Sequence, residues 1–155
     1  MMKLFKLLIL ITSISLFIGC EKKDPSTLNE VHWDRDMCQR CKMVVSERKH
    51  AVQVINLSNS RSYMFDDIGC VVLWFDDEKI EWSSNAKIWI TDVDTGKWID
   101  ARKAFYDTNN VTPMAYGFAA HKSKESIKKG EEVIDFEEIS RRVFEIEKRN
   151  NERRY

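Results

Sequence analysis

The chain has 155 residues, and its 25 Lys and Arg side chains balance 25 Asp and Glu side chains, so the formal net charge is zero. This balance excludes a nucleic-acid binder that relies on overall basicity. Apolar residues make up 43% and charged residues 32%, which is typical of one folded domain and not of a disordered or low-complexity chain. Four cysteines at this length are too few for a disulfide-dense scaffold.

The first twenty residues have the pattern of a bacterial lipoprotein signal peptide. Lys3 and Lys6 form a positive region before an apolar run, over 7–18, that is too short to span a bilayer as a helix. Gly19 and Cys20 follow the run, and a Cys at this position is lipidated in such proteins and becomes the new N-terminus. A plain signal peptide or an uncleaved anchor, each with a free Cys, is the alternative. We therefore expect residues 1–20 to be a lipoprotein signal peptide.

Residues 21–35 are expected to be a flexible tether, because their first part is polar and unpatterned, and residues 36–150 to be the folded domain. Glu21 follows Cys20 where many Gram-negative lipoproteins have the Asp that retains them in the inner membrane. We expect a lipid-anchored protein that faces the periplasm or the cell exterior, on the outer membrane in a Gram-negative cell. Thiols there oxidise unless they are protected.

Alternating apolar residues predict two β-hairpins, each followed by an Asp that can cap a helix. The predicted elements are strands over 51–57, 61–66, 87–93 and 97–99 and helices over 68–75 and 101–106. The order of hairpin, Asp and helix therefore occurs twice, near 51–75 and near 87–106. This weak repeat is consistent with an α+β fold that has antiparallel strands.

The C-terminal part is predicted to contain a loop over 111–121 that enters a strand, a short helix over 123–129 and a charged helix over 135–149. The last of these has an apolar stripe that includes Phe136 and Ile139, so it is expected to be a packing helix with a solvated face.

The most informative motif is a Cys-x-x-Cys pair, Cys38 and Cys41, followed two positions later by Met43. Such a pair can be redox-active, can supply half of a zinc site or can bind a soft metal. In an extended backbone, positions i and i+2 point the same way, so the Cys41 thiolate and the Met43 thioether can meet at one ion. That donor pair favours Cu(I), although Met43 as an apolar packing residue remains an alternative.

A structural zinc site would need a second ligand pair, and the sequence offers none. Outside the motif and Cys20, only Cys70 and three histidines remain. Cys70 falls in the predicted helix over 68–75, so it is expected to be a buried small hydrophobe and not a ligand. A thioredoxin-like site expects a strand before the pair, and none is predicted there.

Further candidate ligands come from the C-terminal half. Met114 follows Pro113 on a stiff loop, so it suits a third soft ligand or a packing role. His121 is either a ligand or a surface residue. Asp66, Asp67 and Asp100 are expected to cap helices, or secondarily to orient metal ligands.

The ordered set of motifs resembles the NosL family of copper-binding lipoproteins. The matching motifs are Cys38-x-x-Cys41-x-Met43, then Phe65-Asp66-Asp67-Ile68-Gly69-Cys70, then Trp89-x-x-Asp92, Trp98-Ile99-Asp100-Ala101 and Thr112-Pro113-Met114-x-Tyr116-Gly117. The resemblance runs from about residue 36 to about residue 130, and the lipoprotein pattern agrees with it. Lys42 is a departure, because the family usually has Gly at this position.

The resemblance implies an α+β fold of two small related ββα-type units, with a C-terminal helix here. It implies a non-enzymatic chaperone that helps to assemble the copper centres of nitrous oxide reductase. Cu(I) would be held by Cys41 and Met43, with Cys38, Met114 or His121 as further ligands. The implied partners are the copper-receiving protein and the membrane, and no nucleic acid.

Two other functions remain open from the sequence. One is a thiol-disulfide oxidoreductase that uses Cys38 and Cys41, with Arg40 and Lys42 lowering a thiol pKa. The other is a structural lipoprotein with a Cys38–Cys41 disulfide and no metal.

Overall fold

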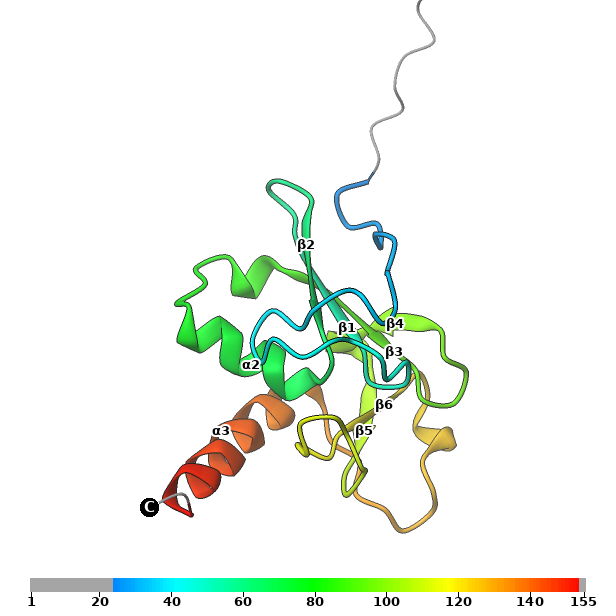
Figure 1. The fold of residues 1–155 in the computed structure, drawn as a ribbon. Helices are drawn as coiled ribbons and strands as arrows, with labels where there is room; N and C mark the ends of the chain where they lie inside the picture. The colour runs from blue at the N-terminus through cyan, green and yellow to red at the C-terminus, as the bar shows by residue number, and fades with distance from the viewer. Residues whose placement is uncertain (1–23, 154–155) are drawn as a thin grey trace, which may run out of the picture.

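The computed structural model describes residues 24–153, so the predicted signal peptide and Cys20 lie outside the described residues. Two antiparallel sheets and two α-helices form its framework (Figure 1). The strands are β1 (Val52–Asn56), β2 (Arg61–Phe65), β3 (Lys87–Thr91), β4 (Trp98–Asp100), β5 (Phe105–Asp107) and β6 (Ala119–His121), and the helices are α2 (Ile68–Asp77) and α3 (Phe136–Glu152). Short 3-10 turns cover Ser83–Asn85, Ala101–Lys103 and Lys124–Ser126.

The larger sheet has the strand order β2-β1-β3-β4, with every neighbouring pair antiparallel. Val52 in β1 pairs with Phe65 in β2 on one side and with Ile90 in β3 on the other. All five residues of β1 are buried. The two predicted hairpins therefore join through β1 and β3 into one continuous sheet.

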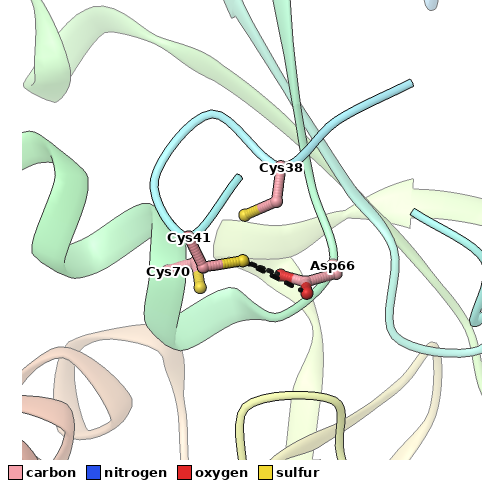
Figure 2. Close-up of side chains that lie close together, drawn as sticks. All are labelled: Cys38, Cys41, Asp66 and Cys70. Carbon is pink, nitrogen blue, oxygen red and sulfur yellow. Dashed lines mark hydrogen bonds between the residues drawn. The ribbon is translucent and has the colours of Figure 1, made fainter. Parts of the chain in front are cut away.

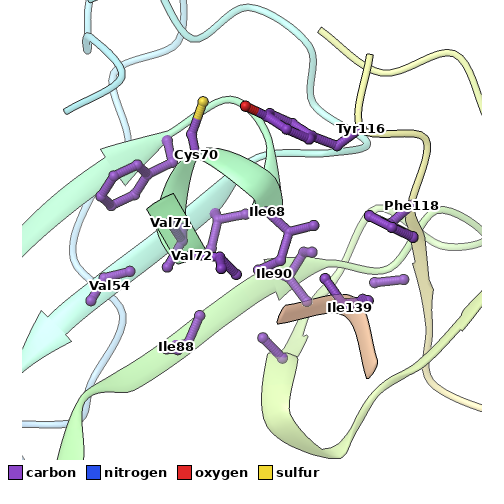
Figure 3. Packing of buried hydrophobic residues seen from close by; sticks show 14 of the residues in the cluster. Val54, Ile68, Cys70, Val71, Val72, Ile88, Ile90, Tyr116, Phe118 and Ile139 are labelled. Carbon is purple, nitrogen blue, oxygen red and sulfur yellow. The ribbon is translucent and has the colours of Figure 1, made fainter. Parts of the chain in front are cut away.

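Helix α2 follows β2 directly because Asp67 caps its N-terminus, where the side chain accepts a hydrogen bond from the Gly69 N–H at 3.0 Å. Residues 68–74 of the helix are all buried against the sheet and α3. Figure 3 shows Ile68, Val71 and Val72 of this helix among core residues from β1, β3 and α3.

Helix α3 packs beside α2 and completes the core. Asp135 caps it by accepting a hydrogen bond from the Glu138 N–H at 2.9 Å, and Ile139 and Val143 are fully buried. The smaller sheet pairs Tyr106 of β5 with Ala120 of β6. The predicted α+β class with antiparallel strands and a C-terminal helix is confirmed.

The second predicted helix, over 101–106, is wrong after residue 103. Asp100 caps only a 3-10 turn, accepting a hydrogen bond from Arg102 N–H at 3.0 Å, and β5 begins at Phe105. Tyr106 is fully buried and pairs its backbone with Ile134 at 2.9 Å in both directions. Strand pairing and burial of this tyrosine outweigh the local helix preference.

The part of the expected tether that the structure describes lies against the domain. The Trp89 indole N–H donates to the Ser26 carbonyl at 2.9 Å, and the Trp33 ring stacks on Trp98 with centroids 6.3 Å apart. Over residues 24–153, no helix combines the length and apolarity that crossing a bilayer requires.

Candidate metal centre

The Cys-x-x-Cys-x-Met motif forms a tight loop, closed by its own backbone. The Cys38 N–H donates to the Met43 carbonyl at 2.8 Å, and the Lys42 N–H donates to the Cys38 carbonyl at 3.0 Å. The flanking residues Met37 and Val44 form an antiparallel bridge. The loop therefore has a defined shape, and both cysteines are held near its base.

Contacts to three other elements fix this loop in place. The Gln39 N–H donates to the Met64 carbonyl of β2 at 2.8 Å. The Arg40 guanidinium donates to Asp77, at the end of α2, at 2.8 Å and to Glu147 of α3 at 3.4 Å. Arg40 thus ties the loop to both helices.

Three thiols and one carboxylate converge beneath the loop. Cys38 and Cys41 come from the loop, Asp66 from the segment between β2 and α2, and Cys70 from the first turn of α2 (Figure 2). Their candidate ligand atoms all lie within 4.8 Å of one another. We call these four residues the cysteine cluster. Its three thiols are free, with no disulfide between them.

The cluster is buried on one side and open on the other. Cys38, Cys70 and Asp66 are buried, whereas Cys41 is partly exposed. Asp66 also lines a surface pocket together with Met43, Val111, Thr112 and Pro113. The Met43 side chain is 50% exposed beside this opening. An ion in the cluster would therefore lie near solvent on the Cys41 and Met43 side.

Hydrogen bonds among the three thiols of the cluster give them different pKa values. A hydrogen bond from Cys70 lowers the pKa of Cys38 to about 7, against the opposing effect of burial. Burial and the neighbouring Cys38 raise the pKa of Cys41 to about 12, and its thiol donates to Asp66 at 3.4 Å. The same bond to Cys38, together with burial, raises the pKa of Cys70. Cys38 is therefore the thiol that is most readily ionised near neutral pH.

Not every predicted ligand belongs to this cluster. Met114 packs against the core, and its N–H donates to Asp67 at 3.2 Å. His121 belongs to a different group, with Asp92 and Asp94. Asp67 and Asp100 cap α2 and a 3-10 turn, as expected from the sequence, whereas Asp66 lies in the cysteine cluster and is not the N-cap of α2.

Cys70 is the residue that the sequence analysis missed. It is buried in the core, as predicted, but its thiol also lies in the cluster. The missed signal is its place three residues after the helix cap Asp67. A side chain in the first turn of α2 lies at the end of β2, next to the neighbouring loop.

The donor set suits a soft metal ion. Thiolates bind Cu(I), zinc and iron-sulfur clusters, and a thioether close by favours Cu(I) among these. The cysteine cluster therefore offers three soft thiols and one harder carboxylate. Zinc also binds Cys-rich sites with four ligands, so the number of cysteines does not distinguish Cu(I) from zinc here. The softness of the nearby thioether is what favours Cu(I).

Comparison with known proteins identifies the fold. The sequence matches no protein-family profile and no curated protein. Among solved structures, the chain is similar to the copper chaperone NosL from Shewanella denitrificans, with a TM-score of 0.61 and 13% sequence identity. The match covers 74% of this chain and 96% of that one. The chain therefore has the fold of the copper chaperone NosL, with a cysteine cluster that is compatible with metal binding.

Proposed function

We propose that this protein is a copper chaperone that carries Cu(I) as its cargo in the cysteine cluster. Cys38 and Cys41 are the principal ligands, Cys70 supplies a third sulfur from below, and Met43 meets the ion from the solvent side. The observation that carries the proposal is the convergence of three free thiols within 4.8 Å under a loop that also presents Met43.

The position of the cluster supports transfer more than permanent storage. Its open side is formed by Cys41 and Met43, which are partly exposed, whereas Cys38 and Cys70 are covered. A partner that approaches this side can add its own ligand before the last of these sulfurs leaves. Ligand exchange of that kind needs no unfolding of the loop.

We propose that the recipient is nitrous oxide reductase, whose copper centres the chaperone helps to assemble. The support is the likeness of fold to a protein described as a copper chaperone, together with the resemblance of this chain's ordered motifs to the NosL family. We further propose that lipid on Cys20 anchors the chain outside the cytoplasm. Replacing Cys20 with Ser should release the protein from the membrane fraction, and continued membrane association would contradict this anchor.

Anaerobic titration of the reduced full chain with Cu(I), against a competing chelator, tests the cargo. We expect saturation at one equivalent. Replacing a residue that only hydrogen-bonds to a metal ligand typically weakens metal affinity by about 10–100-fold. Cys41 is a proposed ligand itself, so Cys41→Ser should weaken Cu(I) affinity by more than about 100-fold. Unchanged affinity in the double variant of Cys41→Ser with Met43→Leu would remove this site.

Met37→Leu is the matched control for Met43→Leu. The two methionines flank the same loop and are 54% and 50% exposed, but only Met43 lines the pocket with Asp66. We expect Met43→Leu to weaken Cu(I) binding about tenfold, a loss of about 1.4 kcal/mol, and Met37→Leu to leave it unchanged. Equal effects of the two variants would place Met43 outside the metal site.

A second function, thiol-disulfide exchange, is favoured by the Cys38 pKa of about 7. Burial of Cys38 opposes it, because an attacking thiolate must reach its substrate. Reduction of insulin by the reduced chain, lost in Cys38→Ser, would favour this activity over the transport of copper.

A further inference from the structure

His121 lies in a second cluster of ligand groups that the proposed copper function does not use. Its ring is only 5% exposed, at the end of β6, beside Asp94 and Asp107. All three residues line one surface pocket, which shares no residue with the pocket beside Met43. We call these three residues the histidine cluster.

One ring nitrogen of His121 has a clear partner. Nδ1 lies 2.8 Å from Asp94 Oδ2, which is a hydrogen-bonding distance. Because an ionised carboxylate only accepts hydrogen bonds, Nδ1–H is the donor in this pair. In the neutral ring, a proton on Nδ1 leaves the lone pair on Nε2.

The other ring nitrogen has no hydrogen bond. His121 Nε2 is the one buried side-chain nitrogen or oxygen without a hydrogen-bond partner among residues 24–153. It nevertheless lies 3.3 Å from Asp107 Oδ2. A lone pair facing a carboxylate at this distance is repulsive unless a positive charge lies between them.

The separation of these two atoms matches that of two ligands on one tetrahedral ion. Zinc bonds of ~2.0–2.1 Å to nitrogen and ~2.0–2.2 Å to oxygen, at a tetrahedral angle, place the two atoms about 3.3–3.5 Å apart. The orientation of the Asp107 carboxylate is fixed by a hydrogen bond that its Oδ1 accepts from the Asn110 side-chain amide at 2.6 Å.

We propose that the histidine cluster binds a divalent ion of the zinc class, with His121 Nε2 and Asp107 Oδ2 as its ligands. Asp94 is a positioning residue: by accepting the Nδ1 proton, it orients the ring and increases its basicity, as carboxylates do behind metal-bound histidines. Water from the pocket completes the coordination. The nitrogen and oxygen donors select a harder ion than the sulfur donors of the cysteine cluster.

Cobalt(II) titration of the reduced full chain, followed by absorption, tests this site separately from the thiols. Binding at the cysteine cluster gives intense thiolate-to-metal bands, whereas binding at the histidine cluster gives only weak ligand-field bands. We expect the ligand-field bands to persist after the Cys38→Ser and Cys41→Ser substitutions and to disappear in Asp107→Asn. Persistence of these bands in Asp107→Asn would overturn the proposal.

Nitrogen-15 NMR of the histidine rings, with Zn²⁺ as the probe, gives a readout that does not depend on the Asp107 substitution. We expect the His121 Nε2 resonance to shift on addition of one Zn²⁺ equivalent to the thiol-substituted chain, while the exposed His32 ring, which lies near Asp36, stays unchanged. Asp94→Asn should weaken Zn²⁺ binding by 10–100-fold. A doubly protonated His121 ring that does not respond to Zn²⁺ would instead identify an imidazolium between two carboxylates and exclude the site.

Discussion

Lys42 is a residue of the cysteine loop whose backbone conformation favours glycine. Its φ of 63° lies in the left-handed region, which costs a side-chain-bearing residue about 1–2 kcal/mol. The loop imposes this conformation, because both Lys42 N–H and Cys38 N–H donate within it. The family that the motif resembles usually has Gly at this position, and the structure supplies the physical reason.

Lys42→Gly should therefore stabilise the protein. Relief of the left-handed strain exceeds the ~0.5–1 kcal/mol of extra chain entropy that glycine loses, so we expect the free energy of unfolding to rise by about 0.5–1 kcal/mol. Urea denaturation measures this change in the free energy of unfolding. Lys42→Ala, which keeps the strain, is the control, and equal stability of the two variants would contradict the argument.

The low pKa of Cys38 depends on one neighbouring thiol. Its largest cause is the hydrogen bond from Cys70, so Cys70→Ala should raise the Cys38 pKa from about 7 toward 9.0. Ultraviolet absorption by the thiolate follows this titration, and Cys38→Ser identifies the signal. Because the folded pKa lies below the ordinary value, this group stabilises the fold above pH 9 and loses that effect as pH falls through about 7.

At the scale of elements, Asp67 joins the start of α2 to the loop that carries Met114. Its carboxylate accepts hydrogen bonds from Gly69 N–H at 3.0 Å, the Thr112 hydroxyl at 2.6 Å and Met114 N–H at 3.2 Å. Burial raises the pKa of Asp67 despite these bonds. One buried side chain thus holds two segments that are far apart in the sequence.

Asp67→Ala should lower the free energy of unfolding by about 2–4 kcal/mol, because it removes a helix cap and leaves buried donors unpaired. Asp135→Ala is the matched control, since Asp135 caps α3 at an exposed position through one such bond, and should cost about 1 kcal/mol. Thermal and urea denaturation measure both. Equal losses would mean that the bonds to Thr112 and Met114 add nothing.

At the scale of the whole molecule, the cysteine loop is held against α2 and α3. Arg40 contacts Asp77 and Glu147, and the Tyr116 hydroxyl donates to the same glutamate at 3.1 Å. The Tyr116 ring lies directly on Gly69, where an added Cβ would overlap it. The cysteine loop therefore rests on the helix pair that also forms the core.

Arg40→Met should loosen the loop while it keeps the packing of the side-chain stem. We expect a loss of about 1–2 kcal/mol in unfolding free energy and faster amide exchange over 38–43. Arg141→Met, whose ion pairs with Glu138 and Glu145 lie on the exposed face of α3, should cost less than about 1 kcal/mol. Unchanged exchange in Arg40→Met would assign the loop's order to its backbone bonds alone.

The sequence by itself determined the four strands of the larger sheet, the two long helices and the caps Asp67 and Asp100. Apolar alternation and helical periodicity are local patterns, and the hydrogen bond of a cap spans only a few residues. The same local reasoning failed at 101–106, where pairing of β5 with β6 decided the backbone. It also identified Cys38 and Cys41, because their spacing brings them close in almost any turn.

The tertiary structure alone decided which other groups join them. Cys70 reaches the cysteine cluster because α2 follows β2 directly and its first turn meets the loop. His121 instead meets Asp94 and Asp107, because β6 pairs with β5 and lies beside the turn after β3. Contacts of this kind depend on how separate elements pack against one another, and such packing produces no local, periodic pattern in the sequence.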